Sequence, residues 1–103
     1  MNPWRGEVAV VVDGETFAAR LTLGALAELE AALKTGSLVE LVERFEGGRF
    51  SAADILALLA AGLRGGGWSG SAETLAHAEI GGGPVGAARA AAELLSLAFK
   101  VPE

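Results

Sequence analysis

The chain has 103 residues, of which 51% are hydrophobic and 20% charged, so it is long enough for one folded domain and too apolar for a disordered protein. Its formal net charge is −5 and its eight Lys and Arg residues are scattered singly, which argues against nucleic acid as a partner. The lack of cysteine excludes disulfides and thiolate metal sites, and no apolar run approaches the roughly 20 residues of a membrane helix. We therefore expect one domain over residues 1–103 that acts in the cytoplasm, without a signal peptide or a membrane segment.

The first predicted element is a β-hairpin over residues 6–22. Two β-prone runs flank Asp13-Gly14, a dipeptide that readily adopts the positive φ angles of a two-residue type I′ turn. A turn of that length pairs Val12 with Glu15 and sets the register of the hairpin. One face then carries six mostly apolar side chains: Val8, Val10, Val12, Phe17, Ala19 and Leu21. Because a hairpin alone is marginal in water, this face must cover helices, or an edge must pair with another chain.

Two helices are expected directly after the hairpin. Thr22 is a suitable N-cap for the first, over residues 23–34, and Lys34-Thr35-Gly36 would end it. The second begins with Ser37 and Glu40, which have the spacing of a capping box. In that motif each of the two side chains accepts a hydrogen bond from the other residue's backbone amide.

The third helix has the strongest start signal in the chain. Ser51 and Asp54 again have the spacing of a capping box, and Phe50 is placed to pack against Ile55 as a hydrophobic staple. Leucines at helical spacing then continue the apolar stripe as far as Arg64.

Two glycine triplets divide the rest of the chain. Gly65–Gly67 and Gly81–Gly83 are expected to end helices in left-handed conformations, with a short helix near 72–80 between them. Pro84 suits the first turn of a last helix, residues 84 to about 99. Its inward side is expected to be Val85, Ala88, Ala92, Leu95 and Phe99. The expected fold is therefore α+β, an N-terminal hairpin followed by about five short helices over residues 23–100.

No group of residues in the sequence indicates catalysis or a bound cofactor. The glycine triplets follow predicted helices instead of strands, and they lack the Lys-Ser/Thr pair with which a P-loop holds phosphate and magnesium. His77 is the only histidine, so one chain can build neither a histidine metal site nor a Ser-His pair from it. Carboxylate pairs such as Glu28 with Glu30 fall on the polar sides of amphipathic helices. We expect a protein that is not an enzyme, with no cofactor and no metal.

Four segments carry a resemblance to a known family: Gly6 to Gly14, Arg20 to Glu30, Ala60 to Gly67 and Ala90 to Phe99. The chain resembles a family encoded in the tail-gene cluster of gene transfer agents and related phages of α-proteobacteria. Its members are described either as tail tube proteins or as tail assembly chaperones. The resemblance covers nearly the whole chain and implies a role in tail assembly without enzyme activity.

The resemblance leaves more than one function open. A tail assembly chaperone would bind the tape-measure protein, and keep it soluble until tail tube protein polymerises around it. Tube subunits of this kind are β-sandwich-like, and a chain with two predicted strands fits a chaperone better. The alternatives are a structural subunit of the tail tube or of a connector ring, which would form a homo-oligomer, and a small acidic regulatory binding module.

A partner-binding surface is the only kind of site that the sequence suggests. Helices near 52–64 and 84–99 carry apolar residues away from their main stripes, and these could form a groove for a helical partner. The residues chosen on this basis are Leu58, Trp68, Leu94 and Leu97. The other interpretation is that these four side chains complete the core.

Overall fold

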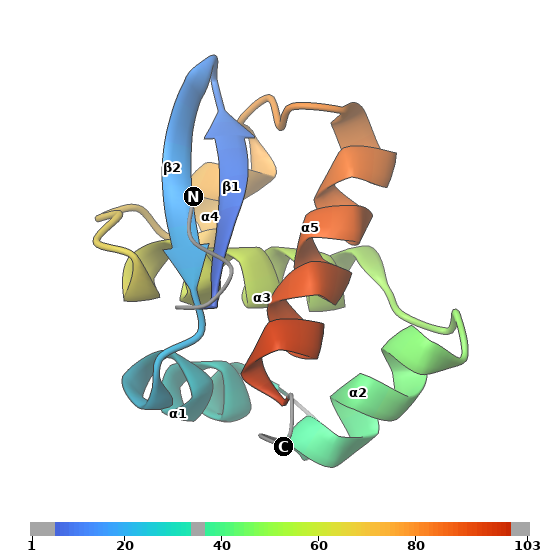
Figure 1. The fold of residues 1–103 in the computed structure, drawn as a ribbon. Coiled ribbons are helices and arrows are strands. Elements are labelled where there is room, and N and C mark those ends of the chain that lie inside the picture. The colour runs from blue at the N-terminus through green and yellow to red at the C-terminus, as the bar shows by residue number, and fades with distance from the viewer. Residues whose placement is uncertain (1–5, 34–36, 100–103) are drawn as a thin grey trace.

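A computed structural model describes residues 6–33 and 37–99. Its elements, in chain order, are β1 (Glu7–Val12), β2 (Glu15–Arg20), α1 (Leu23–Ala32), α2 (Leu38–Glu46), α3 (Ala52–Gly65), α4 (Ala72–Ala76) and α5 (Gly83–Ala98) (Figure 1). An antiparallel hairpin followed by five helices within these ranges confirms the predicted α+β class. The central element is α3, which contacts β2, α1, α4 and α5.

The hairpin has the predicted register. Val12 pairs with Glu15, and the turn residues Asp13 and Gly14 have φ angles of 50° and 82°. Four of the six side chains expected on one face are buried, and the other two, Phe17 and Leu21, are half-buried against the core. The hairpin therefore covers the helices of its own chain, as its apolar face requires.

The tip of the hairpin is bonded to the segment between α4 and α5. The Asp13 amide donates to the Glu79 carbonyl and the Glu79 amide to Asp13 Oδ1, both at 2.8 Å. The Gly81 amide donates to the Val11 carbonyl at 2.9 Å, and Ile80 forms a bridge with Val12. The fourth helix was predicted to end at residue 80, and this prediction is wrong. The backbone of 79–81 pairs with β1, so α4 ends at Ala76.

Gly65 and Gly66 are required by a close approach of α3 to β2. A Cβ on Gly65 would collide with the Arg20 carbonyl oxygen, and one on Gly66 with that of Ala18. Gly66 has a φ of −92°, and within this triplet only Gly67 has a positive φ. The left-handed conformations predicted for the triplet therefore occur at one of its three glycines.

The helix caps follow the predicted pattern in most details. Ser51 and Asp54 form the complete capping box, and Thr22 Oγ1 accepts from the Ala25 amide at 3.0 Å. Ser37 Oγ accepts from the Glu40 amide at 3.4 Å, which is one of the two bonds that a box would have. In α1 the last helical residue is Ala32, and the predicted stop at 34–36 lies outside the described residues.

The last helix buries a different face from the one that the sequence predicted. The buried side chains of α5 are Ala87, Ala91, Leu94 and Leu95. Of the five residues expected to face inward, Val85 is 68% exposed and Phe99 44% exposed, and Ala92 is exposed as well. The prediction is wrong for these three residues, because apolar side chains surround most of this helix and periodicity alone does not select one buried face.

Candidate protein-binding surface

The four residues predicted to bind a partner lie in different environments. Leu58 and Leu94 are core residues, with 0% and 1% of their surface exposed. Leu94 fills the space above Gly62 of α3, where an added Cβ would come within 2.7 Å of Leu94 Cδ1. The interface between α3 and α5 is therefore filled by the chain's own side chains.

Trp68 and Leu97 are half-buried and pack against the core. Trp68 follows α3, its amide donates to the Leu63 carbonyl at 2.9 Å, and its ring lies against Gly70. The ring also lines a shallow cavity at the start of α1, together with Thr22 and Ala25. The structure does not bring the four predicted residues together on one surface, and partner binding by them stays a prediction.

A different apolar surface lies between α2 and α5. A cavity of about 270 Å³ opens between these helices and is lined by Val42, Phe45, Glu46, Ala92, Leu95 and Ser96, which we call the α2–α5 groove. Val39, one helical turn before Val42, is 64% exposed. In Figure 1 the two helices approach each other at the start of α2 and the end of α5 and diverge toward their other ends.

Two of the five residues predicted to face inward, Ala92 and Leu95, form part of the α5 wall of this groove. They belong to a row of five apolar residues that alternate in spacings of three and four along the helix and its C-cap, which we call the outer stripe of α5: Val85, Ala88, Ala92, Leu95 and Phe99. That spacing is the a/d pattern of a coiled coil, in which each apolar residue packs into a hole formed by a second helix. Leu95 is buried, whereas Val85, Ala92 and Phe99 are exposed. Within the described chain, Val85 and Phe99 are left largely exposed.

The rim of the groove on the α2 side is acidic. Glu43 and Glu46 are exposed, lie three residues apart on α2, and have no ion pair within the described residues. Arg89 and Glu93 lie on the solvent side of α5. A helix resting in the groove would therefore gain most from basic side chains along the edge that faces α2.

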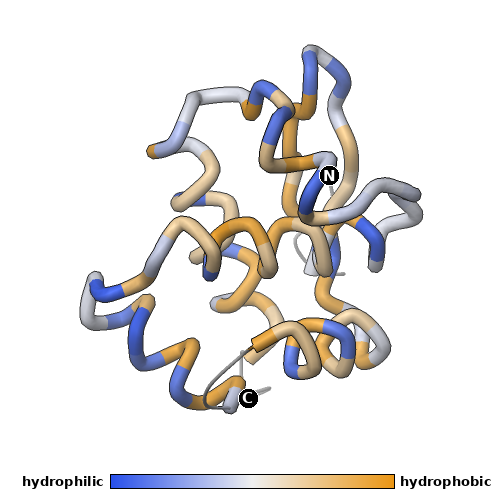
Figure 2. Tube along the Cα trace, turned by 180° about the vertical axis from the view of Figure 1, so that it is seen from behind, coloured by the Kyte–Doolittle hydropathy of each residue, from blue (hydrophilic) through white to orange (hydrophobic). Residues whose placement is uncertain are grey.

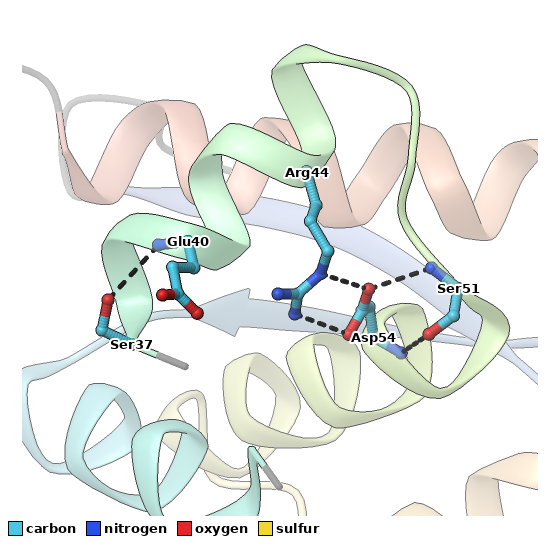
Figure 3. A network of polar contacts seen from close by, with 5 residues as sticks. All are labelled: Ser37, Glu40, Arg44, Ser51 and Asp54. Carbon is cyan, nitrogen blue, oxygen red and sulfur yellow. Dashed lines mark hydrogen bonds and ion pairs between the residues drawn. The ribbon is translucent and has the colours of Figure 1, made fainter. Parts of the chain in front are cut away.

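A polar network holds the end of α2 against the start of α3 (Figure 3). Arg44 donates to both oxygens of Asp54, at 3.0 and 2.9 Å, and the Ser51 amide donates to Asp54 Oδ2 at 2.9 Å. The Arg44 guanidinium, assisted by Ser51, holds the pKa of Asp54 below its ordinary value despite partial burial. Phe45 stacks on Phe50 with ring centroids 4.6 Å apart, which adds an aromatic contact to this junction. The predicted staple between Phe50 and Ile55 stays a prediction.

The described residues include His, Asp and Glu side chains, which are of the kinds that can bind a metal ion. Among them, no group of three or more His, Asp and Glu side chains could hold a metal ion. None of the helices in this part of the chain has the length and apolar character needed to cross a membrane.

Comparison with known proteins identifies the family. A family model described as "Phage tail tube protein, GTA-gp10" matches residues 5–101, so the chain belongs to this family of phage tails and gene transfer agents. No curated protein and no solved structure gives a significant match. The resemblance inferred from the sequence is confirmed, and a tail-related role implies assembly with other proteins.

The groove was missed because its two walls come from helices that are far apart in the sequence. A usable signal was nevertheless present, since the three-four spacing from Val85 to Phe99 and the neighbouring apolar pair Val39 and Val42 are both visible in the printed chain. The sequence did not reveal that the core uses Ala87, Ala91 and Leu94 instead.

Proposed function

We propose that the protein is a tail assembly chaperone, not an enzyme, that binds the tape-measure protein in the cytoplasm. The main support is the outer stripe of α5, which has the spacing of a coiled-coil seam and leaves Val85, Ala92 and Phe99 exposed. Ala92 and Leu95 of this stripe line the α2–α5 groove. Tape-measure proteins are long helices with apolar stripes, and such a stripe fits an apolar groove between two helices. Covering the stripe would keep it from aggregating before the tube assembles.

The electrostatics of the chain support the same role. Glu43 and Glu46 on the rim and the net charge of −5 favour a partner with basic residues beside its apolar stripe. A complex that keeps an acidic surface would also resist association with other copies.

The second candidate is a structural subunit of the tail tube or of a connector ring, and the family description favours it. Strand addition between subunits is the obvious route to such an assembly. Here the edge of β1 is bonded to 79–81 near its end, and the α3 backbone covers the edge of β2 at Ala18 and Arg20. Only part of each six-residue strand is left for pairing, which favours the chaperone.

The proposal is tested by co-expression with the longest open reading frame just downstream, which would encode the tape-measure protein. We expect a soluble complex and, for the purified protein alone, a small species by light scattering. Ala92→Glu puts a charge on the groove wall and should weaken the complex at least tenfold, whereas Ala27→Glu, on an exposed position of α1, should not. Rings or tubes formed by the protein alone would support the structural subunit and contradict the chaperone.

A further inference from the structure

A second groove runs along the other side of α3. Two cavities of about 380 and 390 Å³ share Ala32, Ala53 and Ala57 in their linings, so they adjoin each other along α3. Figure 2 shows this face of the molecule, with α3 crossing between α1 and α4. We call this second groove the alanine groove, because alanine is the commonest residue in its lining: Ala32, Ala53, Ala57, Ala60, Ala61, Ala72 and Ala76.

The alanine groove has the dimensions of a short helix site. It follows α3 from Ala53 to Ala61, nine residues whose ends lie about 12 Å apart along the helix, or a little over two helical turns. Methyl side chains on the floor allow a second helix to approach closely and leave room for its larger side chains. The groove therefore suits a helix that carries Leu, Ile or Met along one stripe.

The two ends of the alanine groove have opposite charge. At the end near the start of α3 lie Arg44, which is occupied by Asp54, and Arg49, which has no ion pair within the described chain. At the other end lie Glu28, which is paired with Arg64 at 3.0 Å, and Glu73, for which the described residues provide no ion pair. One unpaired cation and one unpaired carboxylate thus mark opposite ends.

We propose that the alanine groove binds a second helical segment of the partner, basic in its N-terminal half and acidic in its C-terminal half. Such a segment would place its acidic side chains and the negative end of its helix dipole at Arg49, and its basic side chains and positive end at Glu73. It would run antiparallel to α3. This proposal rests on the proposed function, from which the helical nature of the partner is taken. Together with the α2–α5 groove, the alanine groove would give the protein two binding sites for helices.

The probes are two synthetic 14-residue peptides of identical composition, with leucines on one face. One has lysines in its N-terminal half and glutamates in its C-terminal half, and the other has the reverse order. Wild-type protein should bind the first peptide about three- to tenfold more tightly in a fluorescence anisotropy titration, as expected for two solvent-exposed ion pairs. The double variant Arg49→Glu, Glu73→Lys should invert this preference, which controls for any difference in helicity between the peptides.

Two substitutions locate the bound peptide. Ala57→Leu and, on the opposite wall, Ala72→Leu should each weaken binding at least tenfold by filling the groove, with circular dichroism showing that the variants are folded. Ala92→Glu, in the α2–α5 groove, should leave peptide binding unchanged. Equal affinity for the two peptides, or loss of binding in Ala92→Glu but not in Ala57→Leu, would overturn the proposal. The assay contains no tape-measure protein, so its failure is distinct from failure of the chaperone function.

Discussion

The two sides of α5 have opposite relations to the rest of the chain. The inner side, Ala87, Ala91 and Leu94, is buried against the core. The outer stripe carries side chains that are as apolar, yet Val85 and Phe99 remain exposed. The difference indicates that the inner side contributes more to stability than the outer stripe does. Under the proposed function the outer stripe binds the partner, so substitutions on the two sides should separate stability from binding.

The largest effect on stability is expected from the inner side. Leu94→Ala should lower the free energy of unfolding by about 2 to 5 kcal/mol, because it leaves a cavity above Gly62. The matched truncation Val85→Ala on the outer stripe should change it by less than about 0.5 kcal/mol. Urea denaturation measures both, and similar losses for the two variants would contradict the assignment of the faces.

The next largest effect on the free energy of unfolding is expected at the contact between α3 and β2, which positions the hairpin over the core. Gly66→Ala should cost about 1 to 3 kcal/mol, because its Cβ collides with the rigid Ala18 backbone. Gly24→Ala is the control, since the Cβ there meets nothing closer than Thr22 Oγ1 at 3.9 Å, and a neutral or slightly stabilising change is expected. A neutral Gly66→Ala would show that α3 and β2 are not held this closely.

A smaller effect is expected at the hairpin tip. Asp13→Ala removes the acceptor of the Glu79 amide and places alanine at a φ of 50°, at a cost of about 1 to 2 kcal/mol. Asp13→Asn should lose much less, because asparagine keeps an Oδ1 acceptor and tolerates positive φ. Thermal unfolding of the pair distinguishes this local role from a general effect of lost charge, which would affect both variants equally.

The smallest expected effect is at Asp54, which helps to hold α2 beside the outer stripe. Because the folded state lowers the pKa of Asp54, its carboxylate stabilises the fold at pH values above the unfolded pKa of about 3.9, and this contribution is lost as the pH falls. At pH 6, Asp54→Asn should cost about 1 kcal/mol. The gap between variant and wild type should shrink toward pH 3, and a gap that stays constant would exclude ionisation as its source.

Local features of this fold could be predicted, and contacts between distant segments could not. The turn at Asp13-Gly14 set the hairpin register, and the Ser51–Asp54 capping box marked the start of α3. The bond between Asp13 and Glu79 joins residues 66 positions apart, and no local pattern indicates it. A single domain over the whole chain stays a prediction.

At the candidate site, too, the sequence did not show which segments would contact one another. The residues of the outer stripe were recognised as one apolar row and assigned to the core. This assignment is correct for Leu95 but wrong for Val85, Ala92 and Phe99, because alanine-rich helices offer several possible buried faces. Leu58 and Leu94 were predicted to lie off the main apolar stripes and to bind a partner, and the structure buries both. Sequence periodicity thus identified an apolar row on the last helix but did not show which of its residues are buried.

The most direct test is a methyl NMR titration of valine-labelled protein with the tape-measure protein. Binding at the outer stripe and the α2–α5 groove predicts shifts or broadening for the methyls of Val39, Val42 and Val85. The methyls of Val8, Val10 and Val12, which are buried on the inner face of the hairpin, should change little. Changes confined to the hairpin valines, with Val85 unaffected, would contradict the account.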